Sequence, residues 1–313
     1  RSNCEDMGLD KKCVVTYYAS QQHQASPSQQ PEHIEQATID KPTPVKQEQP
    51  KKLSSDVDIN IPTITKENSN TFAIIIANEN YQEEVNVEYA HHDGEVFKMY
   101  CQKALGLPEE NIHIRLDATL NNIRAELGWM QQVATAYKGQ AQFIVYYAGH
   151  GIPDEQQGNS YLLPTDGKGT MIETGLALSA LYEQLGAMNA QSITVFMDAC
   201  FSGSCRGEGM LASARGIAMK AKTQVPKGKM VVFSAAQGDE TAYPYKEKGH
   251  GLFTYYLLKK LQDTNGDVTY DELGQYISEQ VSRKSVVANG KSQTPTVTAS
   301  EGMANTWKSM KLR

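Results

Sequence analysis

Two apolar runs that each stop at a reactive side chain constrain this chain most. Residues 143–148 (FIVYYA) lead into His150, which has a glycine on either side, and residues 193–197 (ITVFM) lead through Asp198 to Cys200. Runs of β-branched and aromatic residues bounded in this way predict buried parallel strands. Because parallel strands end at the same edge of a sheet, two such neighbours would bring an imidazole and a thiol together there. A cysteine nucleophile and its base are usually assembled in this way.

From residue 71 onward, strand-like and helix-like segments alternate. This alternation predicts an α/β fold, a three-layer sandwich with a mostly parallel central sheet and helices on both faces. Sites in such sheets form beyond the carboxyl ends of the strands, which is where His150 and Cys200 fall. Besides the two runs above, strands are predicted at 72–77, 112–116, 161–163, 229–234 and, as an edge strand, 293–299, and helices at 93–105, 119–137, 178–188, 252–261 and 269–281.

The first 70 residues differ from the rest of the chain. Residues 20–70 are rich in Gln, Pro, Ser and Lys and contain almost no aromatic residues, which is typical of a flexible or extended linker. Before this linker, residues 12–19 (KCVVTYYA) predict a single strand that must dock on something larger. We therefore expect residues 1–70 to form a strand plus a linker, and the compact domain to occupy residues 71–313.

Composition excludes some classes of partner. A net charge of −6 without a basic stripe argues against nucleic acid, and no run approaches the about 18 apolar residues that span a bilayer. The absence of an initiator Met and the Gln/Pro-rich leader favour an exported (periplasmic or extracellular) protein over a cytoplasmic one. An odd number of cysteines with no C-x-x-C pair argues against a zinc site and a full disulfide framework. The five cysteines are Cys4, Cys13, Cys101, Cys200 and Cys205. Cys4 and Cys13 could form a disulfide or be two inert thiols, and Cys101 is expected in the core.

The chemistry at the sheet edge requires a thiolate. Cys200 needs a partner that takes its proton, and His150 is the right residue type near neutral pH. Gly149 and Gly151 permit a turn that leaves the ring unobstructed, and the N–H groups of Gly151 and Cys200 could stabilise an oxyanion. Alternatively, His150 is a strand-end histidine and Cys200 a buried strand cysteine. Finding both at one sheet edge favours an active site.

These motifs resemble the caspase/metacaspase superfamily of cysteine peptidases, in its bacterial caspase-like branch. The likeness covers residues 71–298 and includes the histidine 50 residues before the cysteine. It implies a caspase-like fold with a large-subunit-like part at 71–205, a mobile processing loop at 206–228 and a small-subunit-like part at 229–313. The motifs that carry it are YYAGHG at 146–151, YLLPTD at 161–166, DACFSG at 198–203, VVFSAAQGDETAY at 231–243 and GHGLFTYYL at 249–257.

The resemblance also implies residue roles and specificity. Cys200 would be the nucleophile and His150 the general acid/base. Caspases proper carry Gln two residues before the nucleophile, whereas this chain carries Asp198, as metacaspase-like enzymes do. An acidic S1 pocket should hold a P1 Arg or Lys. Asp93 matches the second acidic S1 position of those enzymes, although Asp is also a favoured helix N-cap.

The loop after Cys200 matches this P1 preference. Its Arg206, Arg215, Lys220 and Lys222 are candidate self-cleavage sites, of which we single out the last three. The enzyme would then be made as a self-processing zymogen. Residues 1–70 could act as a prosegment, with Tyr17 or Tyr18 in the cleft before activation.

No required cofactor and no metal ligand are predicted. Many metacaspases need calcium, but Asn159 stands where those enzymes often carry Asp. Residues 263–272 resemble a calcium loop that is one residue short and lacks the required Gly, while Thr269 and Glu272 fit a helix capping box. His250, in GHGLF, is expected to be structural or part of a pocket wall.

Together these observations predict a cysteine endopeptidase that hydrolyses peptide bonds after Arg or Lys through a thioester acyl-enzyme. Its partners would be protein or peptide substrates; the oligomeric state is not indicated. One alternative is a catalytically silent caspase-like binding or scaffold module, against which the intact Cys200 and His150 speak. Another is a non-peptidase cysteine hydrolase, against which the acidic pair Asp198 and Asp93 speaks.

Overall fold

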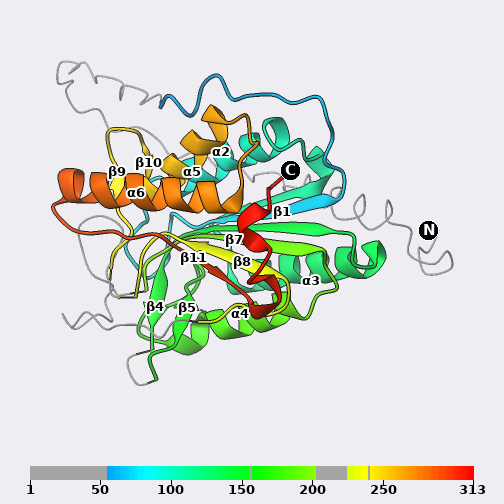
Figure 1. The fold of residues 1–313 in the computed structure, drawn as a ribbon. Helices are drawn as coiled ribbons and strands as arrows, with labels where there is room; N and C mark the ends of the chain where they lie inside the picture. Colours follow the sequence, from blue (N-terminus) through cyan, green and yellow to red (C-terminus); the bar gives the residue numbers. More distant parts are fainter. Residues whose placement is uncertain (1–54, 155–156, 202–223, 239) are drawn as a thin grey trace, which may run out of the picture.

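The computed structural model describes residues 55–154, 157–201, 224–238 and 240–313. At its centre lies a six-stranded sheet with the order β11-β8-β7-β3-β1-β2 (Figure 1). Five strands run parallel, and β11 pairs antiparallel with β8 at the edge. The strands are β1 (Thr71–Ala77), β2 (Ile112–Leu116), β3 (Gln142–Ala148), β7 (Ser192–Asp198), β8 (Met230–Ser234) and β11 (Thr296–Ala299).

Helices cover both faces of this sheet, as the sequence predicts. Helices α2 (Ala90–Lys103), α5 (Leu252–Asp263) and α6 (Tyr270–Asn289) pack on one face, and α3 (Leu120–Tyr137) and α4 (Leu178–Gly186) on the other (Figure 1). Successive residues of β1 enter the two cores in turn, with Ile75 in one and Ile74 in the other. A strand buried on both faces needs apolar residues at every position, which explains its uninterrupted apolar run.

Short elements complete the described part of the chain. Strands β4, β5 and β6 form a three-stranded sheet after the end of β3, and β9 and β10 form a hairpin before α5. Their bounds are β4 (Gly151–Pro153), β5 (Ser160–Leu162), β6 (Leu176–Ala177), β9 (Pro244–Tyr245) and β10 (His250–Gly251), with 3-10 turns at Glu109–Asn111, Ile172–Thr174, Glu301–Met303 and Trp307–Ser309.

Helix α6 differs most from its predicted extent. The apolar period stops near Val281, but the helix continues to Asn289 and ends at Gly290, whose φ of 67° suits a left-handed cap. The extra turns carry exposed side chains, 54% for Val286 and 81% for Val287, so periodicity reports only the buried part of the helix. At its start, the predicted capping box of Thr269 and Glu272 is confirmed.

The segment before β1 lies against the domain, although it was expected to belong to the linker. Ser55 and Val57 are buried, and the Tyr100 hydroxyl of α2 donates to the Val57 carbonyl at 2.8 Å. Gln262 of α5 donates to the carbonyl oxygens of Asp56 and Ile59 at 2.9 and 2.8 Å. The packed chain therefore starts upstream of β1. The predicted strand at 12–19, Cys4, Cys13, Tyr17 and Tyr18 lie outside the described residues.

Two further expectations can be compared with the structure. Cys101 is fully buried in α2, as expected of a core residue, and burial raises the pKa of its thiol far above the ordinary value. Among the helices of the described ranges, none combines the length and apolar character needed to cross a bilayer.

Candidate active site

Two neighbouring parallel strands carry the predicted dyad residues to one sheet edge. In the register of β3 and β7, Ala148 lies opposite Asp198, and the Gly149 N–H donates to the Asp198 carbonyl at 3.3 Å. His150 and Cys200 each follow two residues after this matched pair. The sequence predicts that these two side chains meet at the carboxyl edge of the sheet, and this prediction depends on β3 and β7 being neighbours.

Gly151 shows how closely the two chains approach. A Cβ atom at this position would lie 2.5 Å from the carbonyl oxygen of Cys200 and 2.5 Å from the ring of Phe201. Only glycine fits there, because the contact on one side is backbone and cannot rotate away. The segments of His150 and Cys200 are thus in direct contact, and both side chains are buried, 1% and 2% exposed.

A backbone carbonyl orients the His150 ring. Nε2 lies 2.7 Å from the carbonyl oxygen of Val85, which can only accept, so Nε2 carries the proton. In the neutral ring, Nδ1 is then the nitrogen with a lone pair. The ring also packs against Tyr81 with centroids 4.6 Å apart. These contacts fix both the tautomer and the ring plane.

Two tyrosines fix the backbone of His150. The Tyr81 hydroxyl accepts from the His150 N–H at 2.8 Å, and the Tyr147 hydroxyl donates to the His150 carbonyl at 2.8 Å. Burial raises the pKa of Tyr81 well above its ordinary range, so it stays a neutral phenol. Sequence reasoning missed Tyr81 and Val85: one lies in a polar loop and the other acts through its backbone. Tyr147 was assigned only to the apolar strand.

Asp198 is the last residue of β7 and is 1% exposed. Thr254 of α5 donates to its Oδ2 at 2.6 Å, so the Thr254 oxygen in turn accepts from the Tyr146 hydroxyl at 2.7 Å. The Thr254 hydroxyl is therefore a neutral hydrogen-bond donor to this carboxyl group. Asp198 thus places a carboxyl group two residues before Cys200, in contact with the first turn of α5.

Asp93 is fully buried in α2 and is not the helix N-cap, which corrects the alternative interpretation. The cap position belongs to Tyr89, in a left-handed conformation with φ 69°. The carboxylate of Asp93 instead accepts the Gly251 N–H at 2.9 and 3.2 Å and lies 2.8 Å from His250 Nδ1. Asp93 and Asp198 therefore both contact residues at the start of α5.

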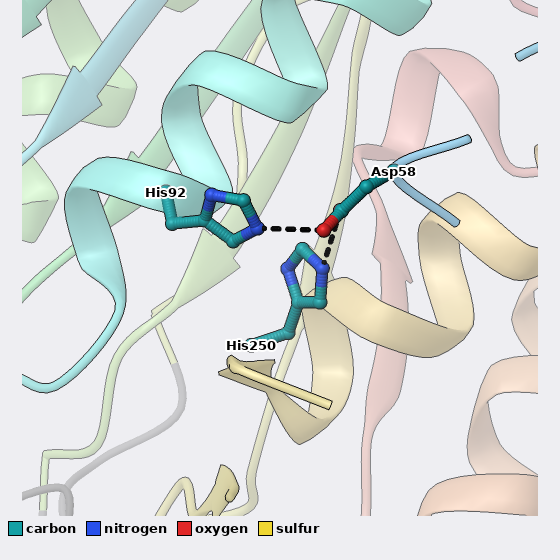
Figure 2. Close-up of side chains that lie close together, drawn as sticks. All are labelled: Asp58, His92 and His250. Atoms are coloured by element: carbon teal, nitrogen blue, oxygen red, sulfur yellow. Dashed lines mark hydrogen bonds and ion pairs between the residues drawn. The ribbon is translucent and has the colours of Figure 1, made fainter. Parts of the chain in front are cut away.

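His250 connects Asp93 to the segment before β1. Its Nε2 lies 2.9 Å from Oδ1 of Asp58, whose Oδ2 lies 3.1 Å from His92 Nε2 (Figure 2). Burial lowers the pKa of His250, but the two carboxylates outweigh this and raise the pKa to about 9. The imidazoles hold the pKa of Asp58 well below its usual range despite partial burial. His250 is thus a buried, charged bridge, in agreement with the expected structural role.

The remaining predicted residues lie outside the described part of the chain or in the calcium-loop-like segment at 263–272. Arg206, Arg215, Lys220, Lys222 and Cys205 lie outside the described residues. In the calcium-loop-like segment, Glu272 accepts from Thr269 at both its N–H and its hydroxyl, and Asp267 pairs with Lys311 at 2.6 Å. In the described part of the chain, one group of His and Asp side chains has the spacing to hold a metal ion: Asp58, His92 and His250.

A family model described as the caspase domain matches residues 70–303. The chain belongs to the caspase-domain family. This membership confirms the predicted superfamily and implies a cysteine-peptidase-like function.

Comparisons with individual proteins agree with this family. The chain is 26% identical to a paracaspase of Dictyostelium discoideum over 207 residues, 66% of this chain but only 47% of that protein. It therefore spans about half the length of this relative. Two crystal structures share the fold: a Geobacter sulfurreducens protein (GSU0716), with TM-score 0.58, 15% identity and 77% and 97% of the two chains covered, and caspase-1 of Spodoptera frugiperda, with TM-score 0.52, 13% identity and 76% and 90% covered. The expected caspase-like α/β sandwich is confirmed.

The β4–β5 ladder determines the direction of the Gly151 N–H, one of the two groups predicted to stabilise an oxyanion in this caspase-domain protein. Gly151 pairs with Leu162, and the His150 carbonyl accepts from the Leu163 N–H at 3.0 Å. Gly151 therefore occupies a non-hydrogen-bonded position of the antiparallel pair, and its own N–H points away from β5. The Gly151 N–H therefore makes no ladder hydrogen bond with β5.

Proposed function

We propose that the protein is a cysteine endopeptidase that cleaves after Arg or Lys, with Cys200 as nucleophile and His150 as general acid/base. The observation that carries the proposal is the Val85 carbonyl at 2.7 Å from His150 Nε2, beside the closely packed Gly151 and Cys200 backbones. A carbonyl on Nε2 leaves Nδ1 as the basic nitrogen. That is the state a general base needs before it accepts a thiol proton.

The steps follow from this arrangement. His150 Nδ1 takes the proton of the Cys200 thiol, and the thiolate attacks the scissile carbonyl carbon. The N–H groups of Gly151 and Cys200 donate to the oxygen that becomes negative. His150 then gives its proton to the leaving amine, which breaks the peptide bond and leaves a thioester on Cys200. Water, deprotonated by the same imidazole, hydrolyses the thioester and restores the thiol.

Substrate choice would rest mainly on Asp198. A buried carboxylate beside the nucleophile attracts a P1 guanidinium or ammonium and repels a P1 carboxylate. Asp198 lies two residues before the nucleophile, whereas the charge of Asp93 is offset by its contact with His250. We therefore assign Asp198 to direct binding of the P1 cation, and Asp93 a weaker contribution from the second acidic position of S1.

The zymogen hypothesis concerns two segments outside the described residues, the first 54 residues and the internal segment 202–223. Self-cleavage after Arg215, Lys220 or Lys222 would separate the large-subunit-like part from the small-subunit-like part. Residues 1–70 are proposed to act as a prosegment. Within it, residues 1–54 lead into Ser55, which is buried in the domain. Mass spectrometry of wild type against Cys200→Ala tests the first idea, and an uncut wild type would refute it. Deletion of residues 1–54 tests the second, which requires a rise in activity.

A panel of fluorogenic peptides with P1 Arg, Lys or Asp, read with and without calcium, tests the proposed function. We expect cleavage of the Arg and Lys peptides, abolished in Cys200→Ala. Cleavage of the Asp peptide alone would contradict the assignment of Asp198. No cleavage of any peptide by fully processed protein would favour the binding-module alternative.

A further inference from the structure

Three side chains far apart in the sequence converge away from the dyad. Asp58 precedes β1, His92 lies in the first turn of α2, and His250 is the first residue of β10 (Figure 2). His92 and His250 are 34 and 192 residues away from Asp58. One ligand atom from each, the two Nε2 atoms and a carboxylate oxygen, lie within 4.8 Å of one another.

We propose that Asp58, His92 and His250 form a binding site for a divalent transition-metal ion of the zinc class. Two imidazoles and one carboxylate are a ligand set that zinc and its neighbours accept, whereas calcium and magnesium prefer oxygen alone. An ion bound here would tie the segment before β1 to α2 and to the β9–β10 hairpin. It would lie outside the dyad and would be a regulatory or stabilising ion.

The distances between the side chains suit such an ion. A tetrahedral ion with bonds of about 2.0–2.1 Å separates its ligand atoms by about 3.3 Å. Asp58 Oδ1 lies 2.9 Å from His250 Nε2, and Asp58 Oδ2 lies 3.1 Å from His92 Nε2. The three ligand atoms lie within 4.8 Å of one another, so small movements of the side chains would seat the ion between them, with one carboxylate oxygen as ligand and the Nε2 proton of His250 released. The fourth position would be taken by water.

A second contact prepares His250 for this role. Its Nδ1 faces Asp93 Oδ1 at 2.8 Å, and the Gly251 N–H holds the same carboxylate at 2.9 Å. Metal-binding histidines usually donate their other nitrogen to a carboxylate, which fixes the ring and directs the second nitrogen to the metal. Asp93 supplies this support from α2, on the opposite side of the ring from Asp58.

The burial of the three side chains gives the site one open side. The side chain of His250 is fully buried, that of Asp58 is 15% exposed and that of His92 is 40% exposed. An ion can enter past His92, and most of its remaining surroundings are protein. The cysteine pattern of the sequence excludes only a cysteine-based zinc site, and these three ligands are too widely separated in the sequence to form a recognisable motif.

The test uses Cys200→Ala as background, because zinc can also bind a Cys–His dyad directly. Zinc binding is measured by competition with a chromogenic chelator, and cobalt is read by its visible absorption. We expect one ion whose cobalt spectrum lacks a thiolate band, and an affinity that falls about 100-fold or more in Cys200→Ala/His92→Gln. Because this background has no nucleophile, the result is independent of the proposed peptidase activity.

His91 provides a matched control. It is adjacent to His92 in α2 and also contacts a carboxylate, Asp117 at 2.7 Å, but takes no part in the cluster. His91→Gln should leave zinc affinity within about twofold, and Asp93→Asn should lower it about 10- to 100-fold. Zinc should also raise the melting temperature of the His91 variant but not of the His92 variant. Equal zinc affinity in the two histidine variants would overturn the proposal and leave the cluster a charged hydrogen-bond network.

Discussion

The chain contains the triplet Gly-His-Gly twice, at residues 149–151 and 249–251, and the two copies have different surroundings. Both histidines are buried, 1% and 0% exposed. His150 donates to a neutral backbone carbonyl, whereas His250 lies between the carboxylates of Asp58 and Asp93. A backbone carbonyl carries no net charge, whereas the two carboxylates raise the pKa of His250 and favour its charged form. The same triplet thus serves proposed catalysis in one place and cross-linking in the other.

The glycines differ in the same way. Gly151 is required by close approach, since a Cβ atom would meet the Cys200 carbonyl. Gly249 is required by conformation, since its φ of 66° lies in the left-handed region. The N–H of Gly251 holds Asp93. A glycine-flanked histidine therefore marks a tight backbone, and the atoms facing the ring decide its chemistry.

The largest effect should come from the dyad itself. Cys200→Ala and His150→Gln should each lower kcat/KM for a P1-Arg peptide by about 10³-fold or more, because the nucleophile or its base is lost. His92→Gln, near the other triplet, should keep at least about one-tenth of the activity. Steady-state kinetics with circular dichroism as a folding control measure this. Near-wild-type activity in His150→Gln would remove the distinction between the two histidines.

The glycines allow a second contrast. Gly151→Ala should lower kcat by about 100-fold, because the Cys200 carbonyl and its side chain must shift. Gly249→Ala should lower the free energy of unfolding by about 1–2 kcal/mol through left-handed strain, with little change in kcat. Urea denaturation and kinetics of both variants separate these effects. The opposite pattern, with activity lost only in Gly249→Ala, would contradict the comparison.

The two acidic residues should differ in specificity. Asp198→Asn should lower kcat/KM for P1 Arg by roughly 10- to 100-fold, because a charged hydrogen bond becomes a neutral one. The effect of Asp93→Asn should be smaller, since His250 already offsets its charge. Matched peptides with Arg or its neutral analogue citrulline at P1 isolate the charge contribution. An unchanged Arg-to-citrulline ratio in Asp198→Asn would exclude Asp198 from S1.

The smallest effect concerns a third buried histidine, His113 of β2, whose Nδ1 contacts Glu126 of α3. Burial would raise the pKa of Glu126, but the hydrogen bond with His113 and the charges of His113 and Arg115 lower it below the usual value. A lowered carboxylate pKa adds stability above the unfolded value of about 4.3, and this stability is lost as pH falls through the folded pKa. Glu126→Gln should lower the free energy of unfolding by about 1–2 kcal/mol at pH 7 and by less at pH 3. A deficit that does not shrink at low pH would show that ionisation of Glu126 adds no stability.

Much of the fold could be predicted from the sequence because two-sided burial leaves a strong pattern. The runs that form β3 and β7 contain apolar residues at almost every position. The pairing of these strands, and the position of His150 and Cys200 just after their ends, could therefore be predicted. Strand β2 was predicted at its observed bounds, Ile112–Leu116. The end of α6 could not be predicted, because its last turns are exposed and have no apolar periodicity.

The surroundings of the site were harder to predict. The Val85 carbonyl orients His150 through a backbone atom, which every residue type has. The composition of the segment around Asp58 predicts a linker, but contacts with α2 and α5 hold this segment against the domain. Asp93 was predicted to line S1, but its partner His250 lies 157 residues away and leaves no local signal.

An irreversible peptide inhibitor with Arg at P1 and a thiol-reactive ketone at its carboxyl end tests the central claim most directly. The account predicts one adduct per chain, located on Cys200 by peptide mapping, and much slower labelling in His150→Gln. The matched inhibitor with Asp at P1 should not label the protein. Labelling of another cysteine, or of Cys200 only by the Asp inhibitor, would contradict the account.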